Sequence, residues 1–275
     1  MNFIKFIFLI FLLCQSAWSS QRPADIVENF DLRYYHPQLM SLKDLSFEIR
    51  ISNLKENVLK SIPLSKLDDL YYEVYWITPG KYHVEVKGLP KGYVELRNEL
   101  KALIQNRLDY VLPQKLAPKV RSYSLKKISE KNGILKILGT DRTHQRGINK
   151  IEIDFDREGK LKSFKTKSPM GSQTSMLSMS KKPWSNNKWV VDRITVTSVQ
   201  GIQTTKMENK LTYKKIDGFG FPSSVKVTTT QELKVATKKA DKKNKRTVKS
   251  EILFSNYKIN KGIAKRKILE NSAKK

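Results

Sequence analysis

Cysteine is almost absent from this sequence. The one cysteine among the 275 residues, Cys14, lies in an apolar segment close to the N-terminus, and none follows it. Beyond that segment the chain therefore has no disulfide, no thiolate nucleophile and no cysteine ligand for a metal. A domain built from such a chain must be held together by the packing of its core.

Histidine is scarce as well, and the common catalytic motifs are missing. His36, His83 and His144 lie far apart and show no ligand spacing, whereas a metal site needs ligands that converge at short intervals or beside a carboxylate. The sequence also has no glycine-rich phosphate loop, no Gly-x-Ser-x-Gly and no His-Glu-x-x-His. We therefore expect no metal, no cofactor and no enzymatic activity.

The segment 141–147 is the most chemically diverse part of the chain, because it combines aspartate, histidine and two arginines. In one interpretation His144 is a general base, and Arg142 and Arg146 clamp a phosphate. In the other, the segment is an irregular connection before a strand. We prefer the second interpretation because no nucleophile motif accompanies the loop.

Acidic residues are few: 26 Asp and Glu stand against 53 Lys and Arg, a formal net charge of +27. Such a charge attracts lipid headgroups, lipopolysaccharide phosphates, acidic polymers and nucleic acid. Lysine spread along a chain can also simply keep an exported protein soluble and its sheet edges unpaired. The basic segment 237–249 is predicted to be a mobile loop, and 261–275 a basic tail, frayed or loosely helical. The cations of the loop that we expect to contact anionic surfaces are Lys238, Lys239, Lys242, Lys243, Lys245 and Arg246.

The N-terminus has the pattern of a secretory signal peptide. Lys5 precedes an apolar run over 6–13, and Ala17 and Ser19 supply the small residues of a cleavage site, which predicts a signal peptide over 1–19 and cleavage after Ser19. An uncleaved anchor is the alternative, but the apolar run is short for a membrane span. Lipidation of Cys14 is a further alternative, disfavoured by the bulky Leu13 before it. We expect a periplasmic protein, with association to the outer membrane as a variant.

Strands dominate the rest of the chain. The stretch 189–235 holds three extended runs rich in Val, Ile, Thr and Tyr, separated by Gly-bearing turns, which predicts an antiparallel β-meander. The other predicted strands cover 45–51, 71–77, 81–87, 120–128, 134–138, 148–155, 160–167 and 248–259. Helical spacing of apolar residues within 23–39 predicts a short N-terminal helix that starts at Pro23 and ends at His36-Pro37, and similar spacing predicts a longer helix over 93–112.

These elements predict a mainly β (α+β) fold. We expect an antiparallel meander that forms a curved sheet or incomplete β-barrel, with an N-terminal helix and one lid helix, as a single domain over 20–260. The strand 71–77 is bulky and apolar on both faces, so it is either buried or open to an apolar ligand. Each apolar residue taken singly is best explained as core, but together they can line a cavity. The predicted lining residues are Phe47, Ile49, Val74, Trp76, Tyr82, Val84, Leu103, Met176 and Ile194.

The layout resembles the periplasmic lipoprotein-carrier and outer-membrane lipoprotein-sorting family (LolA/LolB-like). The resemblance is carried by the order of elements, by the aromatic-turn-aromatic stretch 76–82, and by the hairpins at 155–161 and 213–222. It implies an incomplete β-barrel whose concave apolar face, covered by helices, receives acyl chains. The predicted function is therefore that of a carrier for an acyl chain or lipoprotein lipid. The alternative is a non-enzymatic envelope protein that binds lipopolysaccharide, wall polymer or nucleic acid through its Lys-rich loops.

Overall fold

The computed structural model describes residues 21–61, 67–105, 107–143, 145–233 and 244–273. The predicted signal peptide lies outside these residues, and so do His144 and four cations of the basic loop, Lys238, Lys239, Lys242 and Lys243. The fold class is confirmed: the chain is mainly β, with 52% strand and 22% helix, and its strands pair antiparallel. No helix in the described ranges has the length and apolarity needed to cross a membrane.

Contacts along the chain separate it into two compact units, each built from two stretches of sequence. The first unit contains the described residues up to Arg33 together with Lys115–Pro169, and the second unit contains Tyr34–Gln114 and the described residues from Met170 onward. The prediction of one domain over 20–260 did not foresee this division. The chain passes from one unit to the other without a Gly- or Pro-rich linker, so composition carries no sign of the boundary.

The first unit has four antiparallel strands in the order β7-β6-β5-β4, with two helices. The bounds are α2 Pro23–Arg33, α5 Leu116–Val120, β4 Tyr123–Lys131, β5 Ile134–Asp141, β6 Lys150–Asp156 and β7 Leu161–Ser168. The β4–β5 turn is Asn132-Gly133, and both residues have a positive φ (54° and 73°), the geometry that an Asn-Gly hairpin turn requires.

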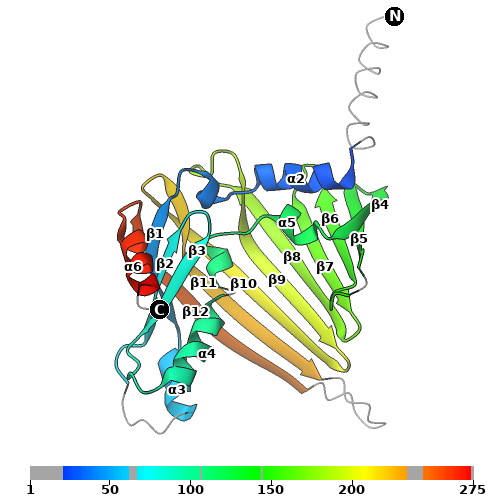
Figure 1. Ribbon diagram of the computed structural model, residues 1–275. Coiled ribbons are helices and arrows are strands. Elements are labelled where there is room, and N and C mark those ends of the chain that lie inside the picture. The colour runs from blue at the N-terminus through cyan, green and yellow to red at the C-terminus, as the bar shows by residue number, and fades with distance from the viewer. Residues whose placement is uncertain (1–20, 62–66, 106, 144, 234–243, 274–275) are drawn as a thin grey trace, which may run out of the picture. The chain divides into compact units, whose positions relative to one another are not determined.

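Alternation decides the two faces of this first sheet. Ile151, Ile153 and Phe155 of β6 are buried, while the residues between them are half-exposed or exposed. Helix α2 packs on the buried face, where the Phe30 ring lies 5.7 Å from the Phe155 ring. Figure 1 shows α2 lying across the ends of the strands, with α5 beside it.

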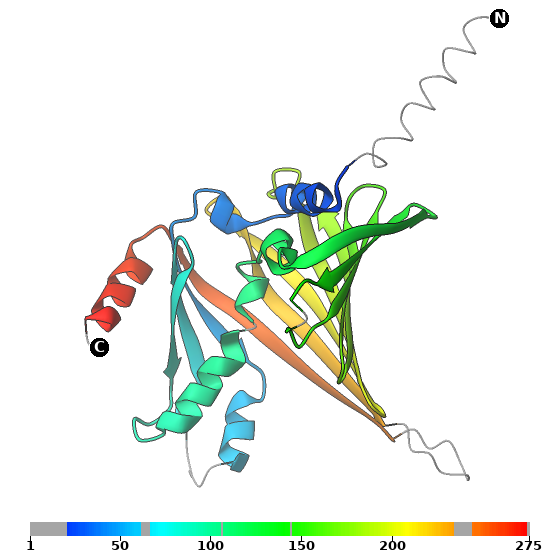
Figure 2. The same cartoon turned by 45° about the vertical axis from the view of Figure 1, so that its right-hand side comes forward.

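The second unit holds a sheet in the strand order β3-β2-β1-β12-β11-β10-β9-β8, and Figure 2 shows that this sheet is curved. Its strands are β1 Asp44–Ile51, β2 Tyr71–Ile77, β3 Lys81–Lys87, β8 Gly171–Lys181, β9 Trp189–Gln200, β10 Gln203–Ile216, β11 Phe219–Leu233 and β12 Asn244–Ile259. Its helices are η2 Pro37–Leu39, α3 Leu54–Ser61, α4 Val94–Gln105, η3 Leu108–Tyr110 and α6 Ile263–Ser272. The first strand pairs with the last one, with Leu45 opposite Ile259.

One face of this second sheet forms the core. Phe47 of β1 stacks on Tyr257 of β12 at 5.3 Å, and Tyr257 stacks on Phe221 of β11 at 4.9 Å. The Tyr257 hydroxyl donates a hydrogen bond of 2.7 Å to the Pro222 carbonyl, so its one polar atom is satisfied inside the aromatic stack. Helix α4 lies against β3, and α6 lies against β1 and β2.

Two sequence predictions are corrected here, and the two alternatives for the tail, frayed or helical, are decided. The helix predicted over 93–112 ends at Gln105, and the chain continues into the separate turn η3. The tail is an ordered helix, α6, because Ala264 and Ile268 are buried against Tyr75. The part of the basic loop from residue 244 onward belongs to strand β12.

Lys245, Arg246 and Lys249 therefore lie in a paired strand, not in a mobile loop. Lys245 stands opposite Glu232 of β11, with 3.6 Å between its ammonium nitrogen and the carboxylate. Charge alone suggested a loop at this place, but the pairing of β12 with β11 satisfies the backbone of the segment.

Candidate ligand-binding site

The predicted cavity residues of strands β1 to β3 are brought together, but mostly as packed core. Phe47, Ile49, Val74, Trp76 and Val84 are all buried, and they belong to one hydrophobic cluster of the second unit. Tyr82, opposite Trp76 on β3, remains 40% exposed. The bulky apolar face of 71–77 is thus buried beneath other residues, one of the two possibilities that the sequence left open.

Of the other three predicted lining residues, one packs against this cluster and two are exposed. Ile194 packs at the edge of the cluster, whereas Leu103 on α4 is 42% exposed. Met176 is 59% exposed and lies opposite Thr195, while its neighbour Leu177 lies opposite Ile194. Since successive side chains of a strand point to opposite faces, Met176 is on the face away from Ile194. Met176 is therefore no part of a lining that includes Ile194.

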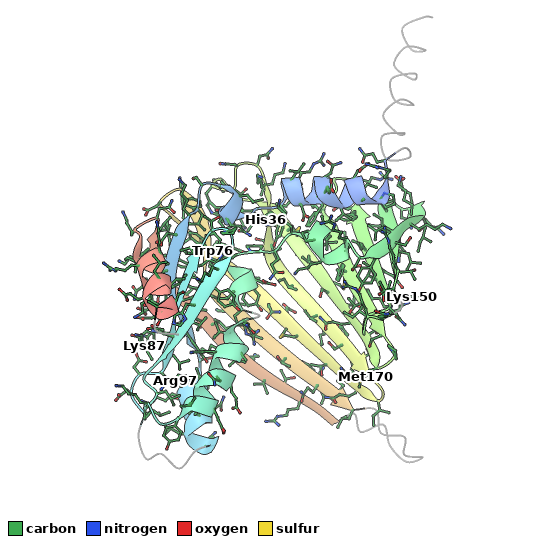
Figure 3. All side chains as sticks on the ribbon, viewed as in Figure 1. His36, Trp76, Lys87, Arg97, Lys150 and Met170 are labelled. Carbon is green, nitrogen blue, oxygen red and sulfur yellow. The ribbon has the colours of Figure 1, made fainter. Side chains whose placement is uncertain are left out.

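Met170 is the methionine that precedes Met176 in the sequence. It is 83% exposed, and Figure 3 places it at the far end of the second unit from Trp76. The three methionines of this region do not form one surface, because Met179 packs against the core cluster and Met176 faces away.

A large pocket instead lies in the first unit, at residues that the sequence did not single out. It has a volume of about 1010 Å³ and is bounded by α2, α5 and the start of β4. Its floor is apolar and includes Val27 of α2, Ala117 and Val120 of α5, and Leu125 of β4. We call it the α2/α5 pocket.

Helix α5 is one wall of this pocket, and a buried carboxylate holds it there. Asp31 of α2 accepts a hydrogen bond from the backbone N–H of Leu116 through Oδ1 and another from Ala117 through Oδ2, both of 2.7 Å. The third residue of α5 is Pro118, which has no N–H to satisfy. Asp31 thus accounts for the donors of the first turn of α5, as an N-cap side chain would.

The rim of the pocket is cationic. Lys115, Arg121 and Arg142 line it and are exposed, and within the part of the chain that the structure describes none of them has a carboxylate partner. Arg22 also lines it but is bound to Asp25, with 2.9 Å between the nearest atoms. Of the two acidic lining residues, Asp31 is occupied by α5, which leaves Glu28.

The 141–147 loop has a structural role that positions one of these cations. Asp141 is buried and accepts hydrogen bonds from Thr143 N, Thr143 Oγ1 and Arg146 N. Burial alone would favour the neutral acid, but the hydrogen bonds from the backbone of Arg146 and Thr143 outweigh it and lower the pKa of Asp141. Because its carboxylate ties down the loop, Arg142 leaves the strand end at a defined place beside the pocket.

The arrangement offers apolar contacts at the floor and ionic contacts at the rim. Among the described residues, no three His, Cys, Asp or Glu side chains come close enough to hold a metal ion. An apolar floor with a rim of guanidinium and ammonium groups fits an amphiphile with an anionic head. The sequence could have indicated Asp31, a carboxylate on the otherwise apolar side of an amphipathic helix, but α5 is too short for periodicity to show.

No known protein family matches the chain, and no curated protein or solved structure matches it either.

Proposed function

We propose that this is a non-enzymatic binding or carrier protein for an amphiphile that has an acyl chain and an anionic head. The acyl chain occupies the α2/α5 pocket, and the head contacts Arg121, Arg142 and Lys115 at the rim. The observation that carries the proposal is the pocket of about 1010 Å³ with an apolar floor and three rim cations. That volume lies at the upper end of the range typical of ligand pockets.

The free energy of binding has one contribution from the alkyl chain and another from the charged head. Each buried methylene contributes about 0.8 kcal/mol, so ten of them contribute about 8 kcal/mol. Association costs roughly 4–15 kcal/mol, so burial of the chain alone yields weak binding. Hydrogen bonds between a charged head and the rim add about 1.5–3 kcal/mol each, and they decide whether the ligand is held.

Dodecyl phosphate tests the proposal by isothermal titration calorimetry. Shortening the chain to octyl phosphate removes four methylenes and should weaken binding by up to about 200-fold, since 1.4 kcal/mol corresponds to a factor of ten. Ala117→Trp places an indole into the pocket from a half-exposed position and should reduce the affinity at least tenfold. Ala102→Trp is the matched control, an exposed alanine of α4 outside the pocket.

Two results would count against the proposal. One is equal affinity of Ala117→Trp and the wild type. The other is an affinity that does not depend on chain length, which would place the alkyl group in water. A neutral dodecyl maltoside that binds as tightly as the phosphate would refute only the role of the rim.

We further propose that the protein is exported and acts in the periplasm, as its N-terminal sequence predicts. N-terminal sequencing of the protein isolated from the cell envelope should then begin at Ser20. The likeness to lipoprotein carriers makes a lipoprotein acyl chain the first natural ligand to examine, by native mass spectrometry of gently purified protein. A spectrum without bound lipid would speak against it.

A second candidate function, binding of a polyanion, rests on the outward face of the second sheet. Arg193 of β9 pairs with Lys210 of β10, and Lys210 pairs with Lys226 of β11. Like charges on directly opposite residues destabilise a sheet. Arg193 is balanced by Glu208, with 3.4 Å between Nε and Oε1, so the row is best explained as a contact for phosphate or sulfate groups at Lys210 and Lys226.

Heparin-affinity chromatography tests this second candidate. Lys210→Gln/Lys226→Gln should lower the salt concentration needed for elution, because fewer counterions are released on binding. Lys162→Gln/Lys188→Gln, which removes two lysines that lie outside this row, is the charge-matched control. Equal elution of the two variants would show that only the net charge of the chain matters.

A further inference from the structure

A second pocket, in the second unit, differs in charge from the strongly basic protein as a whole. It has a volume of about 400 Å³ and lies where the β2–β3 turn meets the end of α4 and the η3 turn. Among the residues that the structure describes, no lysine or arginine lines it, although the chain has 53 of them, and Asp109 is the one charged residue that does. We call it the Trp76 pocket.

Two aromatic rings form one side of this pocket. Trp76 of β2 and Tyr82 of β3 stand opposite each other in the sheet, and both line the pocket. Gln105, the last residue of α4, donates a hydrogen bond of 2.7 Å from Nε2 to the Tyr82 hydroxyl. This bond holds the exposed phenol in a fixed place at the pocket wall, so that its ring is available as a platform.

The polar side of the pocket is made of amides. Gln38, Gln105 and Gln114 line it, and an amide presents both donors and an acceptor, as a hydroxyl group does. Gln38 donates from Nε2 to the Pro113 carbonyl, and because a carbonyl can only accept, the side-chain orientation is fixed. The Gln38 Oε1 atom is then a buried acceptor, for which the described residues supply no hydrogen-bond partner.

A buried acceptor without a partner is costly unless something donates to it. The charge of the residues around this acceptor indicates which class of ligand could donate a hydrogen bond to it. An anionic ligand would meet no lysine or arginine among the described lining residues, and a cationic ligand would have to approach a protein of net charge +27. A neutral ligand with hydroxyl donors and an apolar face can form hydrogen bonds with the amides and pack against the aromatic rings.

From this arrangement we propose that the Trp76 pocket binds a neutral saccharide, with a sugar hydroxyl donating to Gln38 Oε1 and a sugar ring lying on Tyr82. The site is separate from the α2/α5 pocket and does not depend on the function proposed for it. The volume is that of a site for one or two sugar rings rather than for a long chain.

Saturation-transfer difference NMR on the full-length mature protein tests the proposal with maltose and N-acetylglucosamine as neutral ligands. Glucuronic acid and glucosamine serve as the charged comparators. Saturation transfer to at least one neutral sugar is expected, with at least tenfold weaker binding of the charged ones. Absence of transfer to both neutral sugars at 10 mM would overturn the proposal, and so would equal binding of the charged sugars.

Two variants test whether the sugar binds in the Trp76 pocket. Gln38→Met removes the free acceptor while keeping the length of the side chain, and Tyr82→Leu removes the platform at an exposed position, so that folding is preserved. Each should weaken sugar binding at least fivefold. Gln231→Met and Tyr71→Leu are the matched controls, since neither residue lines the pocket. Unchanged binding in Tyr82→Leu would show that the sugar binds elsewhere and would refute the assignment.

Discussion

The buried carboxylate of Asp31 provides the sharpest test of how the α2/α5 pocket is built. Asp31→Ala removes both hydrogen bonds to α5, from the N–H groups of Leu116 and Ala117. Helix α5 has five residues, which is far below the length at which a helix is stable alone. Its position therefore depends on Asp31 and on the burial of Leu116 and Val120.

The magnitude follows from the two bonds. A hydrogen bond to a charged group contributes about 1.5–3 kcal/mol, and two bonds to one carboxylate are not additive, so we expect a loss of about 2–4 kcal/mol. At 1.4 kcal/mol per factor of ten this corresponds to roughly a 30- to 700-fold loss of local protection. The loss should be confined to the turn that Asp31 caps and to the pocket wall beside it.

Hydrogen–deuterium exchange of the peptide that spans 115–123 is the direct measurement. The loss of protection in Asp31→Asn should be intermediate between those of the wild type and Asp31→Ala, because the amide keeps one acceptor and turns a donor towards the other N–H. Asp25→Ala is the control, a half-exposed carboxylate of the same helix that is bonded to Arg22, and this change should leave the protection of 115–123 unaltered.

Asp31→Ala also tests whether the stability of α5 affects ligand binding in the α2/α5 pocket. Asp31 lines the pocket, but both its oxygens are engaged by α5, so it has no free acceptor for a ligand. Dodecyl phosphate should nevertheless bind more weakly to Asp31→Ala, because the wall that it packs against is loosened. Full protection of 115–123 in Asp31→Ala would refute the capping argument. Tighter binding in that variant would refute the acyl-chain orientation, since removing a negative charge would then outweigh the wall.

Three further predictions concern the second unit. Gly220→Ala should cost about 1–3 kcal/mol and lower Tm by several degrees, because a Cβ at this position would lie 2.0 Å from the Trp184 ring. Ile268→Ala should cost about 2–4 kcal/mol and expose α6 to limited proteolysis, whereas the same change at the exposed Leu269 should leave the helix protected. Burial alone would favour a neutral Glu85, but two lysine ammonium groups bonded to its carboxylate outweigh it and lower its pKa below the usual 4.5. Glu85 therefore stabilises the fold above that pH, and the stabilisation is lost as the pH falls through the lowered pKa. The Tm difference between the wild type and Glu85→Gln should be largest at neutral pH and shrink below about pH 4.5; a difference that is constant between pH 7 and 3 would contradict this.

Local sequence signals were sufficient for most strands and turns. The alternation of Leu45, Phe47 and Ile49 predicted strand β1, and the structure buries this row. Asn132-Gly133 lies between two of the predicted strands, 120–128 and 134–138, and both residues have the positive φ of a hairpin turn. These features follow from neighbours within a few residues, so the sequence could determine them.

The faces of the later strands could not be read in the same way. The register between β8 and β9 shifts beyond the Ser178–Arg193 pair, where β9 holds one extra residue, Asp192. The face of Met176 depends on which residue of β9 stands opposite it, and a composition rich in methionine did not reveal that this residue is Thr195 and not Ile194. Likewise, the charge of Lys245 and Arg246 did not reveal that a partner strand orders them.

What the sequence determined by itself is the β-rich antiparallel character, the placement of most turns and the large positive charge, because these depend on composition and on short-range periodicity. What only the tertiary structure decided is where a ligand could bind. Asp31 meets Leu116 across 85 residues of chain, and Trp76 and Gln38 line one pocket although strand β1 and helix α3 lie between them in the sequence. Such meetings are set by packing between distant segments, and a short window of sequence carries no information about them.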